Sequence, residues 1–154
     1  MELLETDIPL PDSENTNYSA ATRLMNTTEG LGVLGENTKA AELYPRISGI
    51  AQRVPIMLYC SLTPQTVAGI AAAAGEQWDK AVEHFETSLR QAHEFPHKLE
   101  QPQVRYWYAK MLTDRDGPGD HDKARQLLGE AIEAYGSIDF PRHLKMAKEL
   151  MGQL

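Results

Sequence analysis

The chain has 154 residues, of which 42% are hydrophobic and 24% are charged, a composition typical of one soluble globular domain. Its formal net charge of -7 comes mainly from residues 1–19, which hold five acids and neither lysine nor arginine. The rest of the chain is close to neutral, which argues against binding to nucleic-acid phosphates. Cys60 is the single cysteine, so an internal disulfide and a cysteine-rich metal site are excluded.

Residues 1–19 are expected to form an extended acidic arm, because Pro9, Pro11 and a run of polar residues disfavour a helix there. Acids follow Met1, where a signal peptide would have a basic region and an apolar run. The longest mainly apolar stretch, from Val54 to Leu62, is far shorter than the ~20 residues that span a bilayer. We therefore expect a soluble, cytoplasmic protein that does not bind membranes.

Beyond the arm, apolar residues recur with the period of a helix, and no segment alternates as a strand would. Thr63 and Pro64 are typical of an N-cap and a first helical position. Pro45 falls inside one expected helix and should kink it. The pattern predicts seven helices, over residues 20–34, 38–52, 64–74, 77–93, 102–114, 121–136 and 141–152.

A short pattern occurs three times, and its alanines lie 41 and then 43 residues apart. Each copy has a glycine followed by an acid, then the alanine, then a large residue four positions later. We expect the glycine to end one helix in the left-handed conformation and the acid to begin the next. The small alanine should let two helices approach closely, and a fixed period of this length is typical of a solenoid. The copies are Gly35, Ala40 and Tyr44; Gly75, Ala81 and Phe85; and Gly119, Ala124 and Leu128.

The Ala-x3-Phe pattern at Ala81 and Phe85 resembles the tetratricopeptide repeat. From about Ile8 to Leu150 the chain is similar to the carboxy-terminal tetratricopeptide region of large bacterial ATP-binding regulators, some of which carry adenylate cyclase domains. The stretches QTVAGIAAAAGEQWDKAVEHFETSLRQA and RYWYAKMLTDRDGPGDHDKARQLL carry this likeness, although the repeat units are longer than the usual 34 residues.

The repeats and the resemblance together predict an all-α fold, a tetratricopeptide-like α-solenoid of about three helix pairs in residues 20–154. The last helix, 141–152, would cap the exposed end of the stack. In the similar regulators this region is a non-catalytic arm that senses or docks something. The chain has neither a cyclase domain nor a P-loop motif. The resemblance therefore implies a protein-interaction scaffold, a regulatory or sensing arm of a bacterial signalling system.

One motif would support a zinc enzyme instead. His93 and His97 match the H-E-x-x-H signature, in which two histidines on one helix face hold the metal. Pro96 lies between them and interrupts the helix that such a site requires. Glu100, a possible third ligand, is expected in a loop. We therefore expect no metal site here and keep a zinc-dependent enzyme as the alternative.

A second motif would support a nucleotide-dependent enzyme. Residues 30–35 match G-x-G-x-x-G, which binds dinucleotides when it follows a buried strand and opens a helix. The preceding residues have a helical pattern, so helix packing and a helix end at Gly35 explain the same glycines. We therefore expect neither a catalytic residue nor a cofactor, and a nucleotide-dependent enzyme through Gly30–Gly35 stays the other form of the alternative.

The helix expected over 102–114 is the candidate binding surface, because the first helix of each pair lines the concave side of such a solenoid. Gln103, Arg105, Tyr106 and Lys110 lie off its core stripe. A tyrosine beside cations can anchor a peptide carboxylate or an acidic segment. Alternatively, Tyr106 packs on a neighbouring loop and Arg105 pairs with a nearby acid. We predict a protein or peptide partner at this surface, and a short stack with an exposed end also allows self-association.

Overall fold

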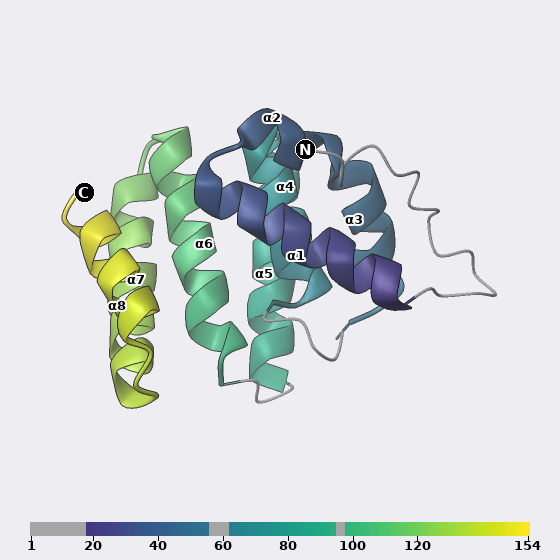
Figure 1. The fold of residues 1–154 in the computed structure, drawn as a ribbon. Helices are drawn as coiled ribbons and strands as arrows, with labels where there is room; N and C mark the ends of the chain where they lie inside the picture. The colour runs from purple at the N-terminus through teal and green to yellow at the C-terminus, as the bar shows by residue number, and fades with distance from the viewer. Residues whose placement is uncertain (1–17, 56–61, 95–97) are drawn as a thin grey trace.

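A computed structural model describes residues 18–55, 62–94 and 98–154, and within these ranges the chain is entirely helical, with turns between the helices (Figure 1). The expected all-α class is therefore confirmed. Residues 1–17 of the expected arm, together with Cys60, Pro96 and His97, lie outside the described residues. The helices are α1 (Tyr18–Leu34), α2 (Asn37–Glu42), α3 (Tyr44–Ala51), α4 (Pro64–Ala74), α5 (Trp78–Glu94), α6 (Glu100–Arg115), α7 (Asp120–Ser137) and α8 (Pro141–Met151).

The helix boundaries agree with the expected ones to within two residues, except over residues 38–52. That stretch forms two helices, because α2 ends at Glu42 and α3 begins at Tyr44 with Pro45 in its first turn. Proline has no N–H to donate and therefore begins a helix more easily than it continues one. The expected helix is thus interrupted at Leu43, whose backbone itself stays in the helical region with a φ of -83° and a ψ of -11°. The expected arm is also shorter, because Tyr18 and Ser19 already belong to α1.

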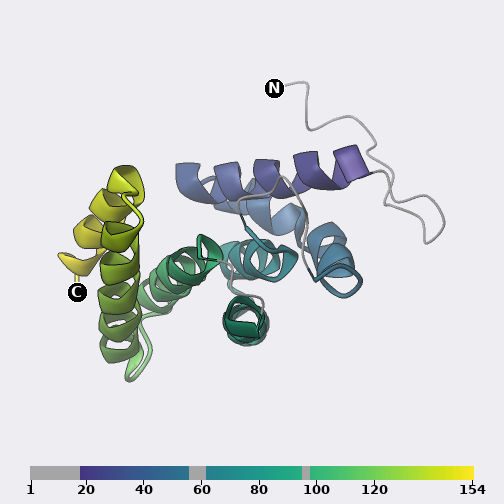
Figure 2. The same cartoon turned by 90° about the horizontal axis from the view of Figure 1, so that it is seen from below.

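From α4 onward each helix packs mainly against the next in sequence, whereas α1 crosses over α4 and also contacts α2 and α3. Figure 1 shows α1 running across α4 and ending beside α6, with α7 and α8 beyond its end, and Figure 2 shows α1 on one side of α4, α5 and α6. The C-terminal turns of α1 reach α6, where Gly32 approaches Trp107. One face of the helical layer is thus partly covered by the chain's own first helix.

The repeated alanines lie where helices meet. Ala40, Ala81 and Ala124 are each 0% exposed, and so are Phe85 and Leu128 of the second and third copies. A methyl group at such a position lets two helix backbones approach without leaving a void. The repeat pattern therefore identified buried positions correctly, although Tyr44, the large residue of the first copy, is only partly buried.

The expected left-handed glycines occur in two of the three copies. Gly35 has a φ of 72° and ends α1 as expected. Gly119 has a φ of 81° but lies at the N-cap of α7, and α6 ends instead at Asp116, with a φ of 51°. The expectation was wrong for Gly75, whose φ is -97°, because the following residue, Glu76, adopts the left-handed conformation with a φ of 53°. The turns after α4 and α6 therefore have an acidic residue, Glu76 or Asp116, in the left-handed conformation, where the turn after α1 has a glycine.

The small residues of α4 permit close packing against α5. A Cβ atom on Gly69 would lie 2.7 to 2.9 Å from three ring atoms of Phe85. Thr63 caps α4 as expected, because its side chain accepts a hydrogen bond from the Thr66 backbone N–H. The sequence thus positions α4 tightly on α5, and this pair supports the surfaces described next.

Candidate functional site

Helix α6 lies at the centre of the candidate site. It packs against α4, α5 and α7, and its remaining face is directed toward α1 and α8. Gln103, Trp107 and Lys110 lie on this face at helical spacing. Gln103 lines a cleft between α1, α6 and α8, and Trp107 and Lys110 line a second cleft between α1, α4, α5 and α6.

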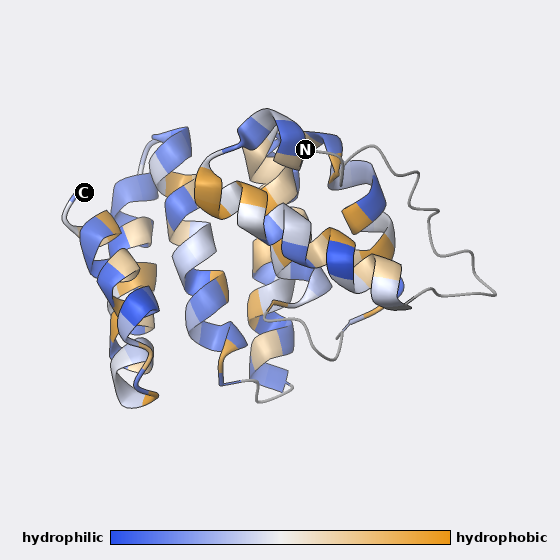
Figure 3. Ribbon diagram, in the orientation of Figure 1, coloured by the Kyte–Doolittle hydropathy of each residue, from blue (hydrophilic) through white to orange (hydrophobic). Residues whose placement is uncertain are grey.

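The first of these clefts, here called the apolar groove, encloses about 480 Å³. Val33 and Leu34 at the end of α1 and Leu99 before α6 form part of its lining. Their exposed fractions are 46%, 76% and 41%, and they are the exposed large hydrophobic residues within the described part of the chain. Figure 3 shows the hydrophobic C-terminal end of α1 at this position. Within the described residues, the exposed large hydrophobic side chains are therefore concentrated at one groove.

On the α8 side, the groove is lined by the aromatic rings of Phe140 and His143 and by the cation of Arg142. His143 of α8 lies against Phe140, with ring centroids 4.6 Å apart, and near the buried Tyr135 at 5.5 Å. Burial lowers the pKa of His143, and the neighbouring positive charge of Arg142 lowers it further. Arg142 is exposed at the groove and forms no ion pair with any described residue.

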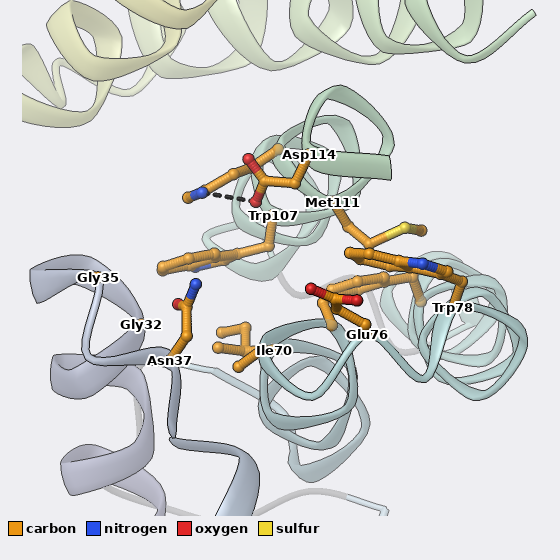
Figure 4. A pocket seen from close by; sticks show the side chains of 13 residues that line it. Gly32, Gly35, Asn37, Ile70, Glu76, Trp78, Trp107, Met111 and Asp114 are labelled. Carbon is orange, nitrogen blue, oxygen red and sulfur yellow. Dashed lines mark hydrogen bonds and ion pairs between the residues drawn. The ribbon is translucent and has the colours of Figure 1, made fainter. Parts of the chain in front are cut away.

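The second cleft, here called the tryptophan cleft, encloses about 360 Å³ (Figure 4). Trp78 of α5 and Trp107 of α6 line it, with Ile70 among the apolar residues between them. Its polar residues are Asn37, Glu76, Lys110 and Asp114, and the Lys110 Nζ lies 2.7 Å from the Asp114 carboxylate.

The four residues predicted for partner binding do not form one surface. Gln103 is buried, with 4% exposed, so its expected place outside the core is wrong. Arg105 lies on the side of α7, where its Nε donates to the Glu130 carboxylate at 2.6 Å, and this is the alternative that the sequence left open. The structure thus divides Gln103 and Lys110 between the two clefts and directs Arg105 away from both.

Tyr106 is partly buried against the core and makes an edge contact with Trp107, with ring centroids 5.5 Å apart. Burial raises the pKa of its hydroxyl, and the acids Asp114 and Glu149 raise it further. The Tyr106 ring therefore has a packing role between α6 and its neighbours in addition to any exposed contact.

The zinc-enzyme motif gains no support from the described residues. His93 is exposed in the last turn of α5, and no group of three potential metal ligands occurs within the described ranges. Glu100 was expected in a loop, but it is the first residue of α6 and is 0% exposed. The expected loop position was therefore wrong, and the carboxylate belongs to a buried cluster described below.

The glycine motif lies in a different structural context from a dinucleotide-binding turn. Gly30 and Gly32 are inside α1, and Gly35 ends that helix, so a helix precedes the motif where a strand is required. A Cβ atom on Gly32 would lie 2.7 Å from Ile70 Cγ2 and 3.3 Å from the Trp107 ring. Gly32 therefore serves the close crossing of α1 over α4 and α6.

Sequence reasoning missed a buried polar cluster around Glu100. Its carboxylate accepts hydrogen bonds from the Thr63 backbone N–H at 3.1 Å, the Thr63 hydroxyl at 2.9 Å and the Ser88 hydroxyl at 3.1 Å. The Thr66 hydroxyl donates to the same carboxylate. Burial raises the pKa of Glu100, while these donors oppose the shift by stabilising the charged form. The cluster joins the start of α4, the middle of α5 and the start of α6.

Comparison with protein-family models, with curated proteins and with solved structures found no match for this chain. None of the described helices is long and apolar enough to cross a membrane. The geometry of the two clefts, together with the sequence pattern, is therefore the basis for a functional assignment.

Proposed function

We propose that the chain is a non-catalytic protein-interaction module built as a tetratricopeptide-like α-solenoid. In this proposal α1 with α2 and α3, α4 with α5, and α6 with α7 are three helix pairs, and α8 is the cap. The complete burial of Ala40, Ala81 and Ala124 supports equivalent helix contacts in the three units. The sequential packing of α4 to α8 is also typical of a solenoid.

The observation that carries the binding function is the gathering of exposed Val33, Leu34 and Leu99 at the apolar groove. Burying apolar surface is favourable by roughly 25 cal/mol per Å², so a partner that covers these side chains gains free energy. The groove lies between two helices, with a third helix contributing Gln103, and this form suits a helical segment of a partner protein.

The charged residues that line the groove are Glu29, which already has an interaction of its own, and Arg142. Arg142 lies at the groove without an ion pair to any described residue, so a partner carboxylate can bind it. The proposed occupant is therefore an amphipathic helix that carries apolar residues on one face and an acid at its edge. The resemblance to bacterial regulators suggests that this partner belongs to a signalling system, in which the chain is a sensing or docking arm.

A displayed library of amphipathic helical peptides tests the proposal directly. Selected peptides should share an apolar face and an acid, and their affinities can be measured by fluorescence anisotropy. The double variant Leu34→Lys with Leu99→Lys should weaken binding about tenfold or more, because it places two charges on the apolar surface. Gln126→Lys places one added positive charge at an exposed position of α7 and should leave the affinity unchanged.

Arg142→Ala separates the charge requirement from the apolar one. It should weaken binding of peptides that carry the acid, and the difference from the unsubstituted chain should shrink at high salt, because salt screens exposed charges. Failure to select any peptide, or equal binding by the double variant, would contradict the proposal. A concentration-dependent dimer in light scattering that Leu34→Lys abolishes would replace the partner helix with a second copy of the chain.

A further inference from the structure

The tryptophan cleft combines aromatic walls with unbalanced acidic charge. Trp78 and Trp107 are the two tryptophans of the chain, and both line this cleft (Figure 4). Trp107 is 6% exposed and is held against Gly32, so it forms a fixed wall, whereas Trp78 is only partly buried. The negatively charged face of an indole ring attracts a cation placed over it.

Two carboxylates line the same cleft with one ammonium group. Lys110 already pairs with Asp114, whereas the Glu76 carboxylate forms neither a hydrogen bond nor an ion pair with the rest of the described chain. The formal charge of the lining is therefore -1. Figure 4 shows the Glu76 carboxylate and both indole rings around one opening.

We propose that the tryptophan cleft binds an alkylammonium or guanidinium group, such as the side chain of a lysine or an arginine in a peptide. The cation would lie between the indole rings and the Glu76 carboxylate. The Lys110–Asp114 pair shows that an ammonium group on a flexible chain fits at the edge of this cleft. The site goes beyond the proposed function, because it shares no lining residue with the apolar groove.

Intrinsic tryptophan fluorescence provides a test with no added label, because both tryptophans lie in the cleft. The unsubstituted chain is titrated with acetyl-Gly-Lys-Gly-amide, with the arginine analogue, and with the norleucine analogue, which has a similar length and no charge. The cationic peptides should give a saturable change, and the norleucine peptide should not. Titration with n-butylammonium distinguishes a site that needs only the amine from one that also requires the peptide backbone, since the latter binds the peptide more tightly.

Two substitutions test whether the cleft binds cations or anions. Glu76→Gln should weaken the cationic peptides about threefold or more, whereas Glu133→Gln, on an exposed part of α7, should have no effect. Lys110→Met should strengthen their binding, because it removes the competing ammonium and leaves Asp114 available. Both substituted residues are outside the fully buried core, and circular dichroism checks that the fold is kept.

Equal binding of the norleucine peptide, an unchanged affinity in Glu76→Gln, or loss of binding in Lys110→Met would each overturn the proposal. The last of these results would mean that the cleft accepts anions through Lys110. None of them involves Leu34, Leu99 or Arg142, so a failure here is distinguishable from a failure of the apolar groove as a binding site.

Discussion

The α4–α7 region and the α1–α3 region use the same repeat pattern with different results. In α4–α7, long helices pack side by side, and the repeated large residues Phe85 and Leu128 are completely buried. In α1–α3, the helix expected over residues 38–52 is divided at Leu43 into α2 and α3, and α1 crosses over α4. The alanine of the pattern is buried in both regions. Pro45 directly follows the large residue Tyr44 and lies in the first turn of α3, where the expected longer helix is divided.

The large residue of each region has a different environment. Phe85 lies against Gly69 and stacks on Tyr108, with ring centroids 5.4 Å apart. Tyr44 is partly buried, its hydroxyl lies 3.2 Å from the His84 Nε2, and the Lys80 ammonium lies 5.2 Å from its ring centroid. Tight apolar packing thus stabilises the contact between α4 and α5. Tyr44, at the start of α3, contacts α5 instead at a polar, partly exposed position.

The largest expected effect comes from substituting Phe85 and tests the difference in packing between the two regions. Phe85→Ala should lower the free energy of unfolding by about 3 to 5 kcal/mol, because it removes a fully buried ring and leaves a cavity against Gly69. Tyr44→Ala should lower it by only about 1 to 2 kcal/mol, because part of that ring remains in water. Urea unfolding followed by circular dichroism measures both values, and equal losses would contradict the distinction between the two regions.

The next largest effect is expected for the buried polar cluster around Glu100. Glu100→Ala should lower the free energy of unfolding by about 3 kcal/mol, because the hydroxyls of Thr63, Thr66 and Ser88 lose their common acceptor in a buried site. Glu100→Gln keeps the size of the side chain and part of this hydrogen bonding, so it should cost less. Thermal unfolding of the two variants at one pH tests this order.

The same carboxyl predicts a pH dependence. Burial raises the pKa of Glu100 in the folded chain above its unfolded value of about 4.3, so the folded state binds the proton more tightly. This contribution is complete below about pH 4 and is lost as the pH rises through the folded pKa. Glu100→Gln cannot titrate, so the unsubstituted chain should lose stability relative to it as the pH rises. A constant difference between pH 4 and 8 would show that the cluster stabilises the charged form enough to cancel the effect of burial.

The sequence predicted the helices well because their apolar period is local. It also predicted the buried alanines, since a repeat records equivalent contacts even when the contacts themselves are unknown. The Glu100 cluster could not be found this way, because Thr63 and Glu100 are 37 residues apart and no motif joins them. A signal did exist at one end: Thr63 was expected as an N-cap, but a cap pattern does not indicate a second partner.

The two clefts were equally hidden, because both depend on where α1 crosses the later helices. Periodicity placed Gln103 outside the core stripe of its own helix, yet it is buried in the folded chain. For Gly32 the sequence favoured helix packing over a nucleotide site, and its closeness to Ile70 and Trp107 agrees with that, although the sequence could not name these neighbours. Gln103 and Glu100, whose environments come from distant segments, are the residues that sequence patterns misassigned.

A smaller effect tests the crossing of α1 itself. Gly32→Ala should lower the free energy of unfolding by about 1 kcal/mol. The new Cβ would overlap Ile70 and press on the Trp107 ring, which costs about 1 to 3 kcal/mol, and the better helix propensity of alanine offsets part of this. The substitution should also shift the tryptophan fluorescence of the folded chain. An increase in stability with unchanged fluorescence would mean that α1 does not lie as closely on α6 as described.

Gly30→Ala is the matched control and has the smallest expected effect. It lies two residues earlier on the same helix, and a Cβ atom there would have no neighbour within 4 Å. Since alanine is favoured over glycine in a helix interior by about 0.5 to 1 kcal/mol, this variant should be more stable than the unsubstituted chain, with unchanged tryptophan fluorescence. The opposite signs of the two substitutions would then follow from tertiary contact alone, because the local helix is the same. If both variants were stabilised, the glycines of α1 would be an ordinary weakness of that helix and not a requirement of its crossing.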